Sequence, residues 1–477
     1  MNTVLAKDQH DISNILMHTV KVAESYYAQQ QELPPSLHVS DLPYTALPEH
    51  GMGAQTVLSY FAKHHAPYMA NSAGPRYFGF VTGGSTPASI AGDWLVSVYD
   101  QVMSGSNDSV AHALERQTIQ FLITLFGLGK DFSGTFVTGA TMSNFVSLAT
   151  ARQWVGEQHH VNFSEDGLSD IPVRVFSATP HSSILKSLSM LGLGRKALIP
   201  VATLSDREAI DVQALEEQLK KHREPSIVVA NAGTVNTVDF DDVKAIVASK
   251  KKYNFWLHVD AAFGGFASVS PRYEHFTQDM ACADTVTIDA HKWLNVPYDA
   301  AMQFTRHKNL QVKVFQNNAA YLGDPELMPD AMHITPENSR RFRALPAWFS
   351  LMAYGKEGYR DIIERNCAAA FQLGELIKQS NAFRLLAPVR MNVVCFTLTR
   401  KETTMEEIRS FLQAVRDDGQ VFFTPTLYKG VPAIRAAISN WQTTFQDVAL
   451  GFEVLEKIQK TFFPGIVRHF EQNLKDY

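Results

Sequence analysis

A lysine directly follows a histidine at the end of a strand-like run in this sequence. In TVTIDAHKWLNV (285–296), Val286 and Ile288 alternate with polar residues, which is the period of a half-buried β-strand. Lys292 therefore follows the strand, at the edge where open α/β sheets bind their ligands. A lysine at this position either extends into water or is held inward as a nucleophilic amine.

Two other polar residues follow predicted strands. Asp260 ends the apolar run WLHVD, and a carboxylate there needs a cationic or N–H partner. His181 lies in TPHSS, before a helix that Ser182 or Ser183 could cap, and its ring could stack on a flat ligand and handle a proton. Taken singly, the aspartate could equally cap a loop, and the histidine could be an ordinary loop residue.

The segment TGATMSN (138–144) is a turn of small residues that opens a predicted helix. Free backbone N–H groups and the helix dipole point at one spot there, which is the outline of a phosphate site. Gly139 and Ala140 allow close approach, and Thr141 and Ser143 can donate from their hydroxyls. By itself the segment is also consistent with a simple helix N-cap.

Together these residues match one ligand that carries a phosphate, a flat ring, a basic ring nitrogen and an aldehyde. That ligand is pyridoxal 5'-phosphate (PLP). Lys292 would tether the aldehyde covalently, and Asp260 would keep the ring nitrogen protonated. This set of residues calls for no metal.

The rest of the chain predicts the frame around these residues. Segments from about 86 to 350 alternate between strand and helix patterns, which indicates βαβ units and a mainly parallel sheet. We therefore predict an α/β protein with a helical N-terminal arm (1–85), a large cofactor-binding domain (86–350) and a small α+β domain (351–477). The arm would pack either on a partner subunit or on its own chain.

Composition narrows the class of protein further. The chain has 477 residues, 45% hydrophobic and 19% charged, which suits a large buried core. A net charge of −5 argues against nucleic-acid partners. Three cysteines without a CxxC motif, no signal-peptide pattern and no apolar run of about 20 residues predict a cytoplasmic protein that does not enter the membrane.

Longer motifs resemble a known family. HVDAA is followed by HKW, with Lys292 lying 32 residues after Asp260, and His181 lies 79 residues before Asp260. With PRYFGFVTGG and GATMSNFVSLATAR, these motifs resemble the group II PLP-dependent decarboxylases, such as aromatic-L-amino-acid, glutamate and diaminobutyrate decarboxylases. The resemblance covers nearly the whole chain and implies fold type I, the aspartate aminotransferase-like fold.

The resemblance also implies individual roles. Tyr321 corresponds to a catalytic-loop tyrosine that returns a proton to the α-carbon. Arg435 and Phe80 correspond to substrate-side residues. The cofactor-binding residues would be Lys292, Asp260, His181, Ala140, Thr141, His291 and Thr234, and the catalytic ones Lys292, His181, Tyr321 and Asp260.

Two positions depart from the family pattern. Val235 stands where relatives commonly have a second threonine that contacts the cofactor, and Thr237 or a water could replace that contact. Asp289, in DAHK, stands where many relatives have the asparagine of NPHK.

The implied activity is decarboxylation of an L-amino acid to an amine and CO2. Phe80 favours an aromatic substrate, whereas the Ser-Asn pair of the phosphate loop favours an acidic one, and a diamino acid also stays open. The same residues would equally serve a different PLP-dependent lyase, an aldehyde synthase, or a cofactor-binding relative without catalysis. Relatives of this family are homodimers with active sites at the interface, which fits the predicted arm.

Overall fold

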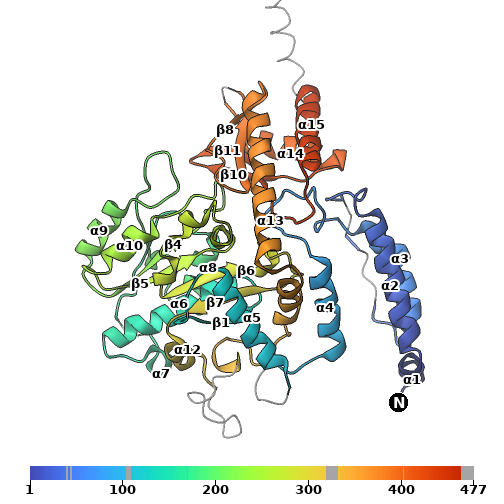
Figure 1. Cartoon of the computed structure of the whole chain (residues 1–477), viewed down its shortest axis with the longest axis horizontal. Helices are drawn as coiled ribbons and strands as arrows, with labels where there is room; N and C mark the ends of the chain where they lie inside the picture. Colours follow the sequence, from blue (N-terminus) through green and yellow to red (C-terminus); the bar gives the residue numbers. More distant parts are fainter. Residues whose placement is uncertain are drawn as a thin grey trace, which may run out of the picture.

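The computed structural model describes residues 1–38, 41–42, 46–103, 109–168, 170–317, 331–400 and 402–462. Tyr321, the predicted proton donor, lies outside these residues. The described chain forms an α/β body, a second smaller sheet and a set of N-terminal helices (Figure 1).

The body is built on a seven-stranded sheet with the order β1-β7-β6-β5-β4-β2-β3. Four neighbouring pairs, from β3 across to β6, are parallel, so the predicted mainly parallel sheet is confirmed. The strand β7 runs antiparallel to both β6 and β1, and the sequence did not predict it. The strands are β1 (Ser133–Val137), β2 (Val175–Ser177), β3 (Leu198–Pro200), β4 (Ser226–Asn231), β5 (Phe255–Asp260), β6 (Thr285–Asp289) and β7 (Ala301–Thr305).

Both faces of the sheet are covered, because the central strands are apolar on both sides. In β4, Ile227 and Val229 pack in a cluster with α6 and α8, whereas Val228 and Ala230 belong to a larger cluster with α5 and α13. The helices of the body are α4 (Pro87–Tyr99), α5 (Ala111–Leu125), α6 (Ala140–Gln158), α7 (Phe163–Asp166), α8 (Ser182–Met190), α9 (Val212–Lys221), α10 (Val243–Ser249), α11 (Ala290–Trp293), α12 (Lys308–Phe315) and α13 (Ala344–Gln379).

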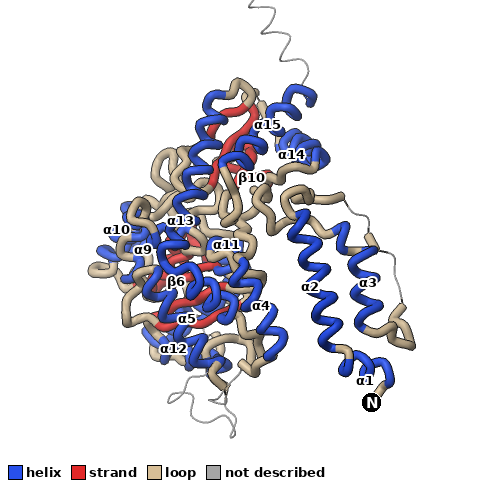
Figure 2. Tube along the Cα trace, turned by 45° about the vertical axis from the view of Figure 1, so that its right-hand side comes forward, coloured by secondary structure: helices blue, strands red, loops and turns tan. Residues whose placement is uncertain are grey.

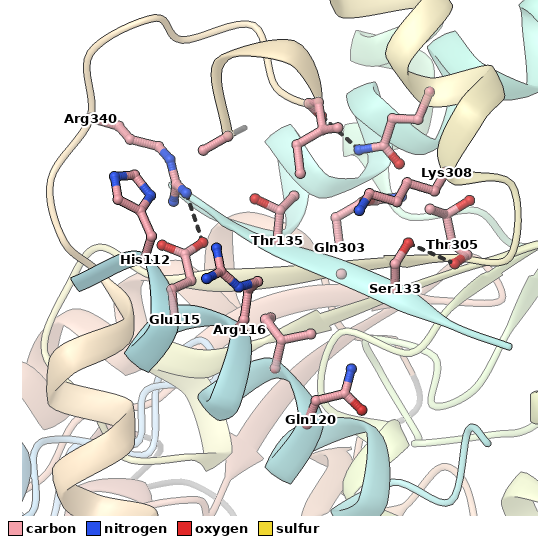
Figure 3. A pocket seen from close by; sticks show the side chains of 15 residues that line it. His112, Glu115, Arg116, Gln120, Ser133, Thr135, Gln303, Thr305, Lys308 and Arg340 are labelled. Carbon is pink, nitrogen blue, oxygen red and sulfur yellow. Dashed lines mark hydrogen bonds and ion pairs between the residues drawn. The ribbon is translucent and has the colours of Figure 1, made fainter. Parts of the chain in front are cut away.

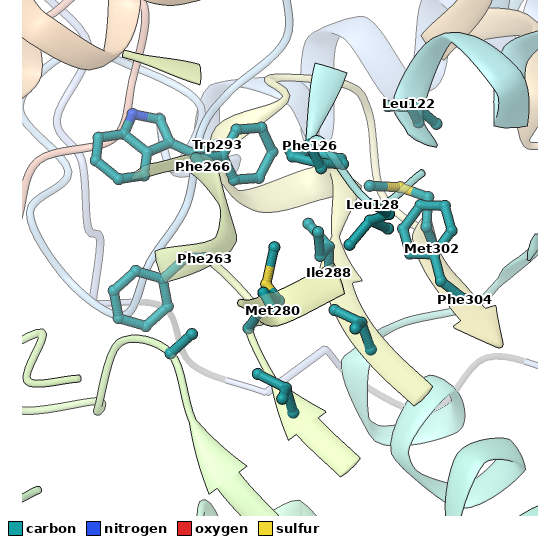
Figure 4. Packing of buried hydrophobic residues seen from close by; sticks show 14 of the residues in the cluster. Leu122, Phe126, Leu128, Phe263, Phe266, Met280, Ile288, Trp293, Met302 and Phe304 are labelled. Carbon is teal, nitrogen blue, oxygen red and sulfur yellow. The ribbon is translucent and has the colours of Figure 1, made fainter. Parts of the chain in front are cut away.

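Part of the larger cluster anchors the segment that carries Lys292 (Figure 4). Trp293 is fully buried, lies 6.1 Å from the ring of Phe266, and donates from its indole N–H to Asn366 Oδ1 at 2.8 Å. Phe266 in turn meets Phe126 edge-on at 5.1 Å. The position of α11 is therefore fixed by the core directly beneath it.

The strand register brings polar residues to one edge of the sheet. Asn231, at the end of β4, pairs with Asp260 at the end of β5, and Asp260 pairs with Thr287 in β6. Because these strands are parallel, their carboxyl ends form a single edge, where ligands of open α/β sheets bind.

The second sheet is antiparallel, with the order β10-β11-β9-β8. It packs with α14, α15 and the second half of α13, which is kinked at Gly355, where φ is +57°. The predicted boundary between residues 350 and 351 falls inside α13, near this kink, and the division into domains stays a prediction. The elements are β8 (Phe383–Leu385), β9 (Val393–Leu398), α14 (Met405–Asp418), β10 (Thr424–Tyr428), β11 (Val431–Ala437) and α15 (Phe445–Phe462).

Three N-terminal helices lie to one side of the body (Figures 1 and 2). They are α1 (Thr3–His10), α2 (Ile12–Gln29) and α3 (Ala54–His64), and none of their residues is buried. Within the described ranges, no helix is long and apolar enough to cross a bilayer.

Candidate active site

A cavity of about 310 Å³ opens at the carboxyl ends of β4 and β5, beside α11. It gathers most of the residues predicted from the sequence. Those that line it are Phe80, Ala140, His181, Thr234, Asp260, Lys292 and Arg435.

Lys292 extends into this cavity from α11. Its Nζ lies 3.1 Å from Asp289 Oδ2 and 5.8 Å from the ring centroid of Phe263. The segment that contains Gly83 packs against the Lys292 backbone so closely that a Cβ at Gly83 would lie 1.6 Å from the Lys292 carbonyl oxygen. Only glycine permits this approach, which helps to fix the lysine.

Asp260 is 6% exposed and faces the same cavity. Its Oδ2 accepts a hydrogen bond from Asn144 Nδ2 at 3.0 Å, and its Oδ1 accepts one from the Ala262 backbone N–H at 3.2 Å. These two hydrogen bonds fix the orientation of the carboxylate.

Asn144 connects Asp260 to His181. The Asn144 amide also donates to Ser183 Oγ at 3.0 Å, and Ser183 Oγ lies 2.8 Å from His181 Nδ1. His181 itself is the N-cap of α8, since the Ser183 backbone N–H donates to Nδ1 at 3.3 Å, so the cap is neither of the serines predicted. Because Nδ1 accepts, the proton of the neutral ring is on Nε2. Burial lowers the pKa of His181, and Asp260 partly opposes this shift.

A buried hydrogen-bond chain supports Asn144 from behind. His258 Nε2 lies 3.0 Å from Asn144 Oδ1, His258 Nδ1 lies 3.0 Å from Thr285 Oγ1, and Trp256 Nε1 donates to Thr285 Oγ1 at 3.1 Å. The Asn144 oxygen can only accept, so His258 Nε2 carries the proton and the bonds run in one direction toward Asp260. Desolvation lowers the pKa of His258 to about 4, which keeps the ring neutral.

The start of α6 also borders the cavity. Its N-cap is Gly139, which has no side chain to satisfy the first N–H groups of the helix, so these groups are left for an anion. Ala140 lines the cavity at this point, and Thr141 lies in the first turn. His291 Cε1 is 3.5 Å from where a Cβ on Gly139 would be, so His291 borders the same loop.

The threonines beyond β4 are held by a carboxylate. Thr234 Oγ1 donates to Glu208 Oε2 at 2.5 Å, and Thr237 Oγ1 donates to the same oxygen at 2.7 Å. Thr234 and Val235 line the cavity, whereas Thr237 does not. Thr237 is therefore not placed to replace the hydroxyl that Val235 lacks.

The two predicted substrate-side residues meet the cavity from different segments. Phe80 is 57% exposed and has a φ of +53°, so it is a cavity wall and not a core residue. Arg435 is 8% exposed; its Nη1 donates to the Val235 carbonyl at 3.2 Å, and its Nε has no partner among the described residues. Burial lowers the pKa of Arg435.

A second cavity, of about 180 Å³, lies at the β1 edge of the sheet (Figure 3). Its main feature is the buried ion pair between Glu115 and Arg340, at 2.7 Å. It contains neither Lys292 nor Asp260, so the chemistry resides in the first cavity.

The first cavity has a suitable group for each part of PLP. An amine and a carboxylate face one space, a histidine ring borders it, and a helix N-terminus with a glycine cap lies at one end. The sequence motifs predicted Lys292, Asp260 and His181, but reasoning from the sequence missed the roles of Asn144, Ser183 and His258. The signal was available, because these three residues lie within four positions of residues that were singled out.

The fold and this cavity define a PLP-dependent enzyme of fold type I. The Oryza sativa TDC solved with PLP and tryptamine superposes with a TM-score of 0.87, at 21% identity over 95% of this chain and 98% of that one. The family model for the pyridoxal-dependent decarboxylase conserved domain matches residues 37–399.

The chain therefore belongs to the pyridoxal-dependent decarboxylase family, and it is a PLP-dependent amino-acid decarboxylase. Curated relatives agree with this. An aromatic-L-amino-acid decarboxylase of Bacillus atrophaeus is 26% identical over 87% of this chain and 86% of its own length. Tyrosine decarboxylase 3 of Petroselinum crispum is 25% identical over 96% of this chain and 92% of its own.

Proposed function

We propose that this enzyme converts an aromatic L-amino acid to its amine and CO2, with the cofactor bound covalently by Lys292. The observation that carries the proposal is that Lys292 and Asp260 line one cavity from adjacent strand ends. The names of the curated relatives and the exposed ring of Phe80 at the cavity wall support an aromatic substrate.

PLP supplies an electron sink for the α-carbon when its ring nitrogen is protonated. In our proposal the Asp260 carboxylate, fixed by Asn144, keeps that proton in place. The first N–H groups of α6, with Thr141, Thr234 and His291, hold the cofactor.

Arg435 and His181 act on the substrate side. The Arg435 guanidinium lines the cavity and would bind a substrate carboxylate. The proton of His181 is on Nε2, which suits the ring for stacking and for proton transfer to the α-carbon together with Tyr321. Orienting the α-carboxylate perpendicular to the cofactor ring would select decarboxylation among the possible reactions.

The test is a screen of aromatic, acidic and diamino acids with PLP-loaded protein, measuring CO2, amine and aldehyde. We expect CO2 and amine in equal amounts, with an aromatic amino acid as the best substrate. Aldehyde in place of the amine would show an aldehyde synthase, a preference for glutamate or a diamino acid would overturn the substrate class, and no turnover would indicate a non-catalytic relative.

We also propose a cytoplasmic homodimer with its active sites at the interface. The helices α1–α3 bury no residue in one protomer but expose Leu16, Val20 and Val57, so a second copy is the natural cover for them. All three cysteines are free, as in a reducing compartment. Light scattering should give a dimer that Leu16→Glu with Val57→Glu weakens, and cell fractionation should place the enzyme in the cytoplasm.

A further inference from the structure

Asp289 occupies the N-cap position of α11 but does not cap the helix. An aspartate at this position usually accepts a hydrogen bond from the second or third N–H of the helix. Here the carboxylate, which is 2% exposed, instead has its Oδ2 3.1 Å from Lys292 Nζ. The Asp289 carboxylate is thus oriented toward the Lys292 amine and does not cap the helix.

The second carboxylate oxygen faces His291. The Ala300 backbone N–H donates to His291 Nδ1 at 3.3 Å, so the proton of the neutral ring is on Nε2, which lies 3.4 Å from Asp289 Oδ1. His291 also stacks on Tyr298, with 4.2 Å between the ring centroids. Asp289 therefore lies between the lysine and the residue that borders the phosphate loop.

Lys292 has no other ion-pair partner within the described residues. Four more charged or titratable groups line the cavity: His181, Asp260, Tyr298 and Arg435. Asp289 alone forms a close ion pair with the lysine nitrogen, and burial at this depth strengthens such a pair.

We propose that Asp289 is the counter-ion of the Lys292 nitrogen, both before and after the cofactor is attached. This inference rests on the proposed covalent role of Lys292. When the lysine ammonium condenses with the aldehyde, a carbon–nitrogen double bond forms, one water leaves with the aldehyde oxygen and two nitrogen protons, and the nitrogen keeps its positive charge. A carboxylate at 3.1 Å stabilises that charge in both states.

The test is the pH dependence of the absorption spectrum of PLP-loaded protein, which changes when the double-bonded nitrogen loses its proton. In Asp289→Asn we expect the midpoint to fall by roughly 1–3 pH units, the usual effect of an opposite charge at close range. Asp289→Ser should behave in the same way, and Asp289→Glu should return the midpoint toward that of the parent.

Asp284 provides a matched control, because it lies at the other end of β6 and also pairs with a lysine, Lys250. Asp284→Asn should leave the midpoint unchanged. If Asp289→Asn and Asp289→Ser gave the same spectral midpoint as the parent, the counter-ion role would be wrong, whereas the proposed function would stand. A Lys292→Ala variant that still formed the absorbing species would instead overturn the proposed function.

Discussion

The side-chain amide of Asn144 donates to the Asp260 carboxylate, with 3.0 Å between Nδ2 and Oδ2. This bond connects the first turns of α6 to the carboxylate at the end of β5. One residue thus holds the Asp260 carboxylate in a fixed position relative to the start of α6.

Asn144→Ala should weaken PLP binding by about 10- to 100-fold, because a hydrogen bond to a charged group contributes about 1.5–3 kcal/mol. The dissociation constant from fluorescence titration measures this. Asn392→Ala is the matched control: Asn392 is also fully buried, but its side-chain amide makes no hydrogen bond within the described residues. Equal PLP affinities for parent and Asn144→Ala would contradict the bridging role.

His258 should make stability depend on pH. Its pKa is lowered from 6.5 to about 4 in the folded chain, so the unfolded chain binds the extra proton first as the pH falls. The neutral His258 therefore adds about 3 kcal/mol to the free energy of unfolding above pH 6.5. This addition is lost progressively as the pH falls toward 4.

This contribution is measured as a difference between the parent and His258→Gln. The pKa of the buried Asp241 is raised to about 6, so Asp241 adds to the stability of the folded chain as the pH falls from 6 toward 4. This effect is the same in the parent and in His258→Gln, and it cancels in the difference. Denaturant unfolding at several pH values should show the parent losing stability relative to His258→Gln on acidification. Parallel curves would contradict a neutral, buried His258.

Arg435→Met should raise the KM for the amino acid about tenfold or more while leaving PLP affinity close to that of the parent, because the arginine is proposed to bind the substrate carboxylate. Arg390→Met is the control, since Arg390 lies 3.3 Å from Asp239 and does not line the cavity. A loss of PLP affinity with an unchanged KM would assign Arg435 to the cofactor instead.

The ion pair at the β1 edge should matter for stability and not for chemistry. The side chains of Arg340 and Glu115 are 2% and 9% exposed, so Arg340→Met leaves a buried carboxylate without its cation. We expect a loss of about 3–5 kcal/mol in unfolding free energy, and partial recovery in the double variant with Glu115→Gln. A single variant as stable as the parent would show that the pair is not needed.

The sequence predicted the main layout of the fold because apolar strands and amphipathic helices alternate clearly in it. It did not predict β7, because AMQFT is short and its antiparallel pairing depends on β1 and β6, which are distant in sequence. The kink in α13 was also missed, although Gly355 lies at its centre.

The structure brings Lys292 and Asp260 to one cavity, as expected from their places after two predicted strands. Asn144 and His258 were missed because their roles arise from hydrogen bonds between elements that are more than 100 residues apart. The sequence raised Thr237 as a replacement for the hydroxyl that Val235 lacks, but only the structure showed that Thr237 is bound to Glu208 and lies outside the cavity.

The most direct test of the central claim is to reduce the PLP-loaded enzyme with borohydride and locate the cofactor by peptide mapping. Our account predicts that the pyridoxyl group is found on the peptide that contains Lys292, and that Lys292→Ala carries none. A stable modification of another lysine, such as Lys250, or the absence of any modified peptide in the loaded enzyme would contradict it.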